Sequence, residues 1–330
     1  MMSDDYDVLA VGNAIVDVLA AADDDLLERL AIPKGSMRLI SAEEAEALYS
    51  QMGPGREVSG GSAANTTAGI AALGGRAAFV GRVSDDQLGR VFAHDIRAAG
   101  VEYRVPMSHG GRPTGQCLII VSPDAQRTMS TYLGSCQELD ESDIDEAMVR
   151  AAKVTYLEGY LWDPPAPTRA LKKAMAVARA AGRTVAFTLS DVFCVNGFRD
   201  DMLGLLGAHV DLLFGNENEV QALFRTTDTA AAMAELSRRL PLAVVTLNAA
   251  GAVVVEGDAR HAVPVSPAKR VRDTTGAGDL FAAGFLTGFT QGRSLSDSAV
   301  MGTIAAAEVI DHYGARPEAD LKALVRARLG

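Results

Sequence analysis

The sequence has few cysteines and none in a close pair. Cys117, Cys136 and Cys194 are the only three in 330 residues, and no CxxC spacing occurs. A disulfide framework or a cysteine-rich zinc site is therefore not expected, and a reducing cytoplasm fits best. Basic charge is also scarce, because 31 Lys and Arg face 42 Asp and Glu for a net charge of −11. Nucleic acid and anionic membranes need a basic surface, so neither is an expected partner.

Long apolar runs and several well-known motifs are missing as well. No 18 apolar residues run without a polar interruption, so no membrane span is predicted. Acidic Asp4 and Asp5 stand where a signal peptide would be basic, so the start is expected to belong to the mature protein. No GxxxxGK[ST], no GxGxxG after the first strand and no HExxH occurs. These absences argue against a P-loop enzyme, a Rossmann dehydrogenase and a zinc protease.

Short β-rich runs alternate with helical segments along the chain. The β-rich runs are residues 7–12, 77–83, 154–160, 184–190, 210–216 and 242–248, and the clearest helical patterns are residues 85–100, 166–182 and 228–240. Such alternation favours an α/β fold with a mostly parallel central sheet between two helical layers. A single domain spanning residues 1–330 is the simplest interpretation.

Two regions break this rhythm and predict a small accessory sheet. Residues 13–40 contain a short helical segment and the β-rich run SMRLIS. Residues 101–131 contain the run GQCLIIVS and the turn PDAQ, and RTMSTYL follows as the second arm of a hairpin. Ser41 and Glu44 match a capping box, which predicts a helix that begins immediately after the first region. We expect the two regions to form a β-rich lid over the main core.

The segment Asp273–Leu286 joins a glycine turn directly to an apolar helix. Around Gly276, Ala277 and Gly278 the backbone N–H groups can converge on an anion, and the helix dipole points its positive end at the same place. Asp279 follows, where a carboxylate can accept the proton of an attacking hydroxyl. These residues are therefore the predicted catalytic group for phosphoryl transfer. Taken alone, the same glycines could merely shape a turn, and the acid could merely favour a helix start.

The whole run from Asp273 to Leu286 resembles the second signature of the PfkB, or ribokinase-type, carbohydrate kinases. Gly60–Asn65 resembles the first signature of that family. The resemblance spans nearly the whole chain and implies a ribokinase-like fold, with ATP as co-substrate. It also implies that Gly60 and Gly61 let the backbone approach sugar hydroxyls and that Asn65 bonds those hydroxyls. Read singly, this second segment could be a glycine-rich loop capping a helix.

Further resemblances assign the remaining site residues. Asn13 and Asp17 fall where the family binds the acceptor, with Asp17 on the vicinal hydroxyls. Asn216 and Glu219 match the NxxE motif that orders Mg²⁺, mostly through water. A nucleotide loop is assigned to Thr246 and Gly251, although Asn248 replaces its usual first glycine.

Two assignments near the phosphates are less direct. Arg127 matches an arginine that reaches the phosphates of ATP in adenosine kinases, and a solvated strand arginine is the alternative. Asp273 and Thr275 match residues that hold a monovalent cation, such as K⁺, in relatives. Carbonyl oxygens dominate such sites, so the sequence itself does not identify a cation.

The acceptor is predicted from three short segments. Residues 12–17, 189–193 and 312–315 resemble adenosine kinases more than sugar kinases, although Asp191 and Val192 depart from the pattern. A purine also needs apolar walls, and the candidates, which could equally form the lid's own core, are Ile15, Met37, Leu39, Tyr132, Leu133 and Phe193. We therefore expect transfer from ATP to the 5′-hydroxymethyl group of a nucleoside, adenosine to AMP, by a monomer or homodimer. The alternatives are a ribokinase- or fructokinase-type sugar kinase and a non-catalytic nucleotide- or sugar-binding regulator.

Overall fold

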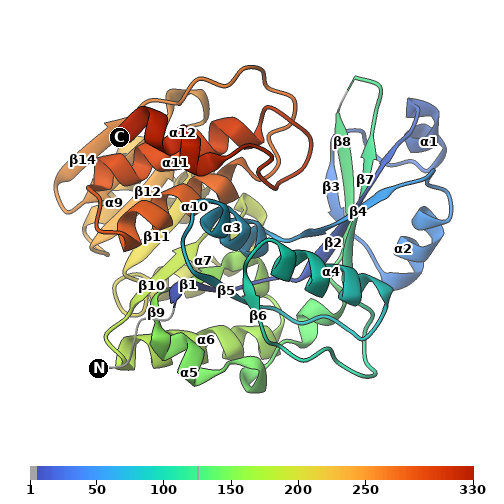
Figure 1. The fold of residues 1–330 in the computed structure, drawn as a ribbon, viewed down its shortest axis with the longest axis horizontal. Helices are drawn as coiled ribbons and strands as arrows, with labels where there is room; N and C mark the ends of the chain where they lie inside the picture. The colour runs from blue at the N-terminus through green and yellow to red at the C-terminus, as the bar shows by residue number, and fades with distance from the viewer. Residues whose placement is uncertain (1–5, 125) are drawn as a thin grey trace.

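The computed structural model describes residues 6–124 and 126–330, in which the strands form a large sheet and a small one (Figure 1). The large sheet has nine strands in the order β14-β13-β12-β11-β10-β9-β1-β5-β6. In chain order these are β1 (Tyr6–Val11), β5 (Ala77–Val80), β6 (Glu102–Tyr103), β9 (Ala152–Glu158), β10 (Thr184–Thr188), β11 (Leu212–Asn216), β12 (Leu242–Thr246), β13 (Ala252–Glu256) and β14 (Ala259–Val263).

The six predicted β-rich runs all become neighbouring strands of this sheet. β12, β11, β10, β9, β1 and β5 pair in parallel, so their carboxyl ends meet at one edge. The prediction missed β6, which has two residues, and the antiparallel strands β13 and β14. These three lie toward the ends of the sheet, where β6 is very short and β14 is largely exposed, so both leave a weak sequence pattern, whereas β13 is a buried apolar run that was overlooked.

Helices cover both faces of the large sheet, as the alternating pattern predicts. One layer contains α3 (Ser62–Ala72), α10 (Ala277–Thr290), α11 (Leu295–Val309) and α12 (Leu321–Leu329), and the other contains α5 (Glu146–Ala151), α6 (Pro165–Ala180), α7 (Val192–Leu205), α8 (Glu217–Phe224) and α9 (Thr229–Ser237) (Figure 1). The three-layer α/β/α prediction is therefore confirmed. Within the described residues, no helix has both the length and the apolar character needed to cross a membrane.

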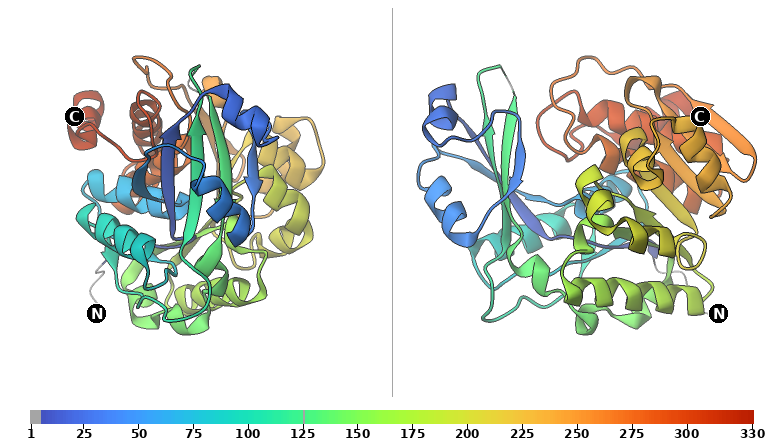
Figure 2. Two further views of the ribbon diagram at one scale, coloured as in Figure 1. Left: turned by 90° about the vertical axis from the view of Figure 1, so that its right-hand side faces the viewer. Right: turned by 180° about the vertical axis from the view of Figure 1, so that it is seen from behind.

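The small sheet stands at one end of the large domain (Figure 2). Its order is β3 (Met37–Leu39), β8 (Arg127–Tyr132), β7 (Gly115–Val121), β2 (Ile15–Ala21) and β4 (Arg56–Gly60). Four of these strands fall within or next to the two segments predicted to break the rhythm, and β4 was not anticipated. Residues 1–5 and Ala125, in the predicted turn of the hairpin, lie outside the described residues.

The two faces of the small sheet differ in what covers them. Helices α1 (Asp24–Arg29), α2 (Ala42–Tyr49) and α4 (Gln87–Ala98) accompany this sheet, and α2 begins with the predicted capping box of Ser41 and Glu44. Val16 and Val18 of β2 are buried, whereas Asp17 and Leu19 on the alternate face are partly exposed. That second face lines a cavity together with the loop that follows α11. The three cysteines are free and buried.

Candidate active site

Asp279 lies in the first turn of α10, which begins at a glycine with a left-handed backbone. Gly276 is the N-cap with φ of 79°, and a Cβ there would lie 2.6 Å from the Cβ of Ala315. Gly278 has no positive φ and no heavy atom within 4 Å of a built Cβ. The turn therefore needs glycine at Gly276, and Gly278 leaves open space in front of the helix N-terminus.

Two donors from α3 hold the Asp279 carboxylate. The hydroxyl of Ser62 donates to Oδ1 at 2.7 Å, and Nδ2 of Asn65 donates to Oδ2 at 3.0 Å. Burial raises the pKa of Asp279, and these two hydrogen bonds oppose the rise. A carboxylate with a raised pKa is a stronger base, so this arrangement suits proton removal from a hydroxyl.

The contact between α3 and α10 explains why these groups meet. The helices pack so closely at Gly69 that a Cβ there would lie 2.7 Å from Ala283 Cβ. The hydroxyl of Thr66 also donates to the carbonyl of Asp279 at 3.2 Å. Asn65 was predicted to bond sugar hydroxyls, whereas here its amide nitrogen is engaged by Asp279. Ser62 lies inside the first signature but was not predicted as a site residue.

The diglycine of the first signature admits close neighbours from the protein. A Cβ on Gly60 would lie 2.6 Å from both carboxylate oxygens of Asp17, and one on Gly61, where φ is 99°, would overlap the carbonyl oxygen of Asn13. Burial raises the pKa of Asp17 to about 7, against the lowering effect of Arg316 and Arg127. Within residues 6–124 and 126–330, no hydrogen bond reaches the Asp17 carboxylate, which lines the cavity. It remains available to accept hydroxyl donors.

Glu158, at the end of β9, joins two loops of the site. Its carboxylate accepts the N–H of Asn13 at 2.7 Å and the N–H of Ala63 at 2.8 Å. The side chain is fully buried, and burial raises its pKa to about 7 although both hydrogen bonds lower it. Glu158 was not predicted as a site residue from the sequence. An acid ending an otherwise apolar strand, VTYLE, is the signal that could have identified it.

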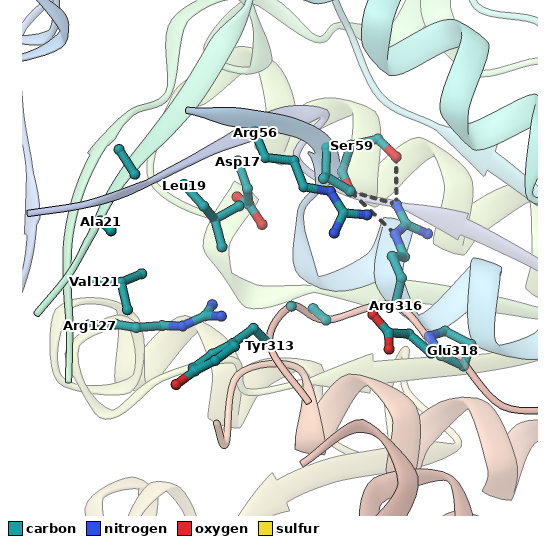
Figure 3. Close-up of a pocket in the computed structure, with 15 residues that line it drawn as sticks. Asp17, Leu19, Ala21, Arg56, Ser59, Val121, Arg127, Tyr313, Arg316 and Glu318 are labelled. Atoms are coloured by element: carbon teal, nitrogen blue, oxygen red, sulfur yellow. Dashed lines mark hydrogen bonds between the residues drawn. The ribbon is translucent and has the colours of Figure 1, made fainter. Parts of the chain in front are cut away.

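A cavity of about 380 Å³ lies between the open face of the small sheet and residues 313–318 (Figure 3). Asp17 and Arg127 line it from the sheet, and Tyr313 and Arg316 line it from the loop. Arg127 forms an ion pair of 2.7 Å with Asp273 and lies over the Tyr313 ring at 5.6 Å. The predicted phosphate-binding arginine is therefore buried between the small sheet and the loops that contain Asp273 and Tyr313, beside the glycine turn.

Asp273 is held by several protein groups. Its carboxylate accepts the N–H of Thr275 at 3.1 Å and the N–H of Gly314 at 3.0 Å, besides pairing with Arg127. These contacts fix the glycine turn against the loop after α11. The carboxylate itself is thereby occupied, so any cation at the predicted position would depend on carbonyl oxygens.

The predicted apolar walls divide between the two faces of the small sheet. Met37 and Leu39 are 42% and 49% exposed, and the register places Leu39 beside Thr131 and Cys117, on the face that carries Asp17. Tyr132 pairs with Gln116 and lies on the opposite face, so it is not brought to the cavity side. The reason is that side chains alternate along a strand. Phe193, at the start of α7, is 49% exposed.

The predicted nucleotide residues lie at the carboxyl ends of adjacent strands. Asn216 ends β11 and pairs with Thr246, which ends β12. Asn216 caps α8 in a capping box with Glu219, and burial raises the pKa of Glu219 to about 7. Gly251 has φ of 95°, and a Cβ there would overlap the carbonyl of Val263. The described residues contain no group of three or more His, Cys, Asp or Glu arranged to hold a metal.

Known proteins resemble this chain over nearly its full length. The crystal structure of adenosine kinase from Sinorhizobium meliloti is 50% identical, with a TM-score of 0.92 over 98% of this chain and 99% of that one. A probable sugar kinase from Rhizobium etli is 46% identical, with a TM-score of 0.93 over 98% of both chains. The adenosine kinase of Saccharomyces cerevisiae is 27% identical over 93% of this chain and 95% of its own length.

The family assignment rests on most of the chain. Residues 35–321 match the pfkB family of carbohydrate kinases. This range includes both predicted signatures, the buried Asp279 and the donors that hold it. The chain therefore belongs to the pfkB family of carbohydrate kinases.

Proposed function

We propose that this protein transfers the γ-phosphate of ATP to the 5′-hydroxyl of adenosine, which yields ADP and AMP. Family membership makes the chain a phosphotransferase with an alcohol group as acceptor. The observation that carries the mechanism is the junction of α3 and α10, where Ser62 and Asn65 hold Asp279 beside an open helix N-terminus. The choice of adenosine is supported by the 50% identical adenosine kinase.

In the proposed reaction Asp279 takes the proton of the 5′-hydroxyl as that oxygen attacks the γ-phosphorus. The bond between that phosphorus and the bridging oxygen breaks, and ADP leaves with its electron pair. The N–H of Ala277 already donates to the carbonyl of Thr274 at 3.2 Å, so the N–H groups of Gly276, Gly278 and Asp279, with the α10 dipole, stabilise the charge on the transferred group. Asp17 accepts hydrogen bonds from the two ribose hydroxyls, and Met37 and Leu39 offer apolar surface to the purine.

Charged and oxygen-bearing groups complete the proposed nucleotide site. Arg127 lies next to the glycine turn, where its guanidinium can meet the phosphates. Asn216 and Glu219 provide the oxygen donors that Mg²⁺ prefers, and they would hold it through water, where it offsets phosphate charge. A K⁺ ion would use carbonyls of residues 273–275, because Arg127 already pairs with the Asp273 carboxylate. A potassium titration of activity tests that site.

A sugar kinase is the second candidate, and the 46% identical probable sugar kinase favours it. The test is kcat/KM for adenosine, inosine, ribose and fructose measured side by side. We expect adenosine to exceed ribose by at least about a hundredfold, because a bound base adds several kcal/mol of binding and 1.36 kcal/mol is tenfold in rate. Equal or faster turnover of ribose or fructose would refute the nucleoside assignment and leave the kinase assignment intact. If none of the four acceptors supports ATP turnover, a non-catalytic regulator would be favoured.

A further inference from the structure

Arg316, in the loop between α11 and α12, holds Ser59, just before the first signature, and Ala64, near its end. Its Nη1 donates to the carbonyl of Ala64 at 2.8 Å. Nε and Nη2 donate to the carbonyl of Ser59 at 3.3 and 3.2 Å, and Nη2 also reaches the Ser59 hydroxyl at 3.1 Å (Figure 3). One planar guanidinium therefore spans the segment that contains Gly60, Gly61 and Ser62.

The segment held in this way touches both carboxylates of the site. Gly60, next to Ser59, lies against the carboxylate of Asp17. Ser62, inside the segment, donates to Asp279, as does Asn65, which directly follows Ala64. A change in the backbone between Ser59 and Ala64 would displace these groups together. Misplacement of reacting groups by about 1 Å can reduce a rate by about a hundredfold.

Other charged groups surround Arg316 from each neighbouring element. Asp17 approaches from β2, Asp279 from α10 and Asp95 from α4. Asp95 accepts the N–H of Ser59 at 3.2 Å, so Ser59 is held at its N–H by Asp95 and at its carbonyl by Arg316. Arg127 and its partner Asp273 also act on Asp17 through their charges, and the charge of Asp279 raises the pKa of Glu158. Burial lowers the pKa of Arg316 to about 10, which leaves it protonated at neutral pH.

We propose that Arg316 is a positioning residue for phosphoryl transfer, whose guanidinium fixes the Ser59–Ala64 segment and through it the contacts of Ser62 and Asn65 with Asp279. Its positive charge has a second consequence for the same carboxylates. Arg316 lowers the pKa of Asp17 and of Asp279, so its removal would raise both. The kinetic part of this inference rests on the proposed function, whereas the structural part does not.

The kinetic experiment compares Arg316→Lys and Arg316→Met with Arg56→Met across pH. Arg56 lines the same cavity, is exposed and makes no hydrogen bond or ion pair in the described part of the chain, so it is the matched control. We expect Arg316→Met to lower kcat/KM for adenosine at least about a hundredfold and to move its acid limb to higher pH. Arg316→Lys keeps the positive charge, so the acid limb should stay at the wild-type pH. Its kcat/KM should still fall at least about tenfold, because an ammonium group lacks the planar fork of donors that a guanidinium has.

A second experiment needs no acceptor substrate. Amide hydrogen exchange is measured in wild type, Arg316→Lys and Arg56→Met without ligands, and we expect exchange in residues 60–65 to become at least about tenfold faster in Arg316→Lys alone. Unchanged exchange there, or full kcat/KM in Arg316→Lys, would overturn the positioning role. An equal loss of activity in Arg56→Met would assign the effect to cavity charge instead. If wild type does not phosphorylate adenosine, the proposed acceptor fails while the exchange result still decides the role of Arg316.

Discussion

The two helices that meet at Asp279 begin with the same kind of N-cap, but their first N–H groups have different hydrogen-bond partners. Both α3 and α10 have a glycine N-cap with positive φ, Gly61 at 99° and Gly276 at 79°, and neither has a side-chain cap. At α3, the N–H of Ala63 donates to the buried Glu158 carboxylate. At α10, the N–H groups of Gly278 and Asp279 find no acceptor among the residues that the structure describes.

This difference shows how one kind of helix start can serve two purposes. The positive end of a helix attracts an anion, and the unpaired N–H groups need acceptors. The protein supplies its own acceptor, the Glu158 carboxyl group, to α3, and that helix consequently becomes a fixed support. The open start of α10 leaves its donors for a phosphate from outside. The N-cap glycines Gly61 and Gly276 are both enclosed, whereas Gly278, in the first turn of α10, faces open space.

Replacing the base at the junction of the two helices should have the largest effect. We expect Asp279→Asn to lower kcat by about 10² to 10⁴, because an amide cannot take the hydroxyl proton. ATP binding and the unfolding midpoint should stay close to wild type, as measured by calorimetry and urea denaturation. Asp297→Asn is the control, since Asp297 lies in the first turn of α11 away from the cavity. Near-normal turnover by Asp279→Asn would remove the base from the mechanism.

A pair of glycine substitutions tests the contrast between Gly61, the enclosed N-cap of α3, and Gly278, the open position in the first turn of α10. Gly61→Ala should cost about 3 kcal/mol or more of unfolding free energy, because positive φ costs about 1–2 kcal/mol and the new Cβ overlaps Asn13. Gly278→Ala should leave stability within about 1 kcal/mol, since alanine suits a helix, yet reduce kcat at least about tenfold by obstructing the phosphate. Urea denaturation and steady-state rates measure both. The comparison breaks down if Gly278→Ala is fully active or if Gly61→Ala is as stable as wild type.

Contiguous features of this site could be predicted from the sequence. The glycine turn, Asp279 and the helix after them are consecutive, so their local physics is visible in one segment. The six central strands were predicted because burial on both faces gives each a continuous apolar run. A turn with two glycines does not reveal from sequence which one is left-handed, and the structure shows that it is Gly276.

Contacts between distant segments could not be predicted in this way. Ser62 and Asp279 are 217 positions apart, and Arg316 and Ala64 are 252 positions apart. Neither pair has a local pattern, because the packing of α3 on α10 and the path of the loop after α11 bring them together. Tyr132 failed as a cavity residue for a related reason, since one position along β8 places it on the other face.

Removing the Glu158 carboxyl group should alter how the free energy of unfolding depends on pH. The folded-state pKa of Glu158 is about 7 against an ordinary value of 4.5. This group therefore contributes full stability below pH 4.5 and loses it as pH rises toward 7, by on the order of 3 kcal/mol. Because glutamine does not titrate, the unfolding free energy of Glu158→Gln relative to wild type should increase over that window. Urea denaturation at several pH values measures this, and parallel curves for the two proteins would contradict it.

The smallest expected effect comes from the hydroxyl that connects the two helix starts. Ser62→Ala removes the 2.7 Å hydrogen bond to Asp279 and leaves Asn65 as the other donor. That hydrogen bond lowers the pKa of Asp279, so its loss should raise the pKa and protonate the base at higher pH. We expect the acid limb of kcat/KM to move to higher pH and kcat to fall about tenfold, the equivalent of about 1.4 kcal/mol for one hydrogen bond to a charged group. Ser296→Ala, an exposed position on α11, is the control. A fall in kcat without a shift of the limb would mean that Ser62 orients the carboxylate without tuning its charge, and α3 would then act on α10 by geometry alone.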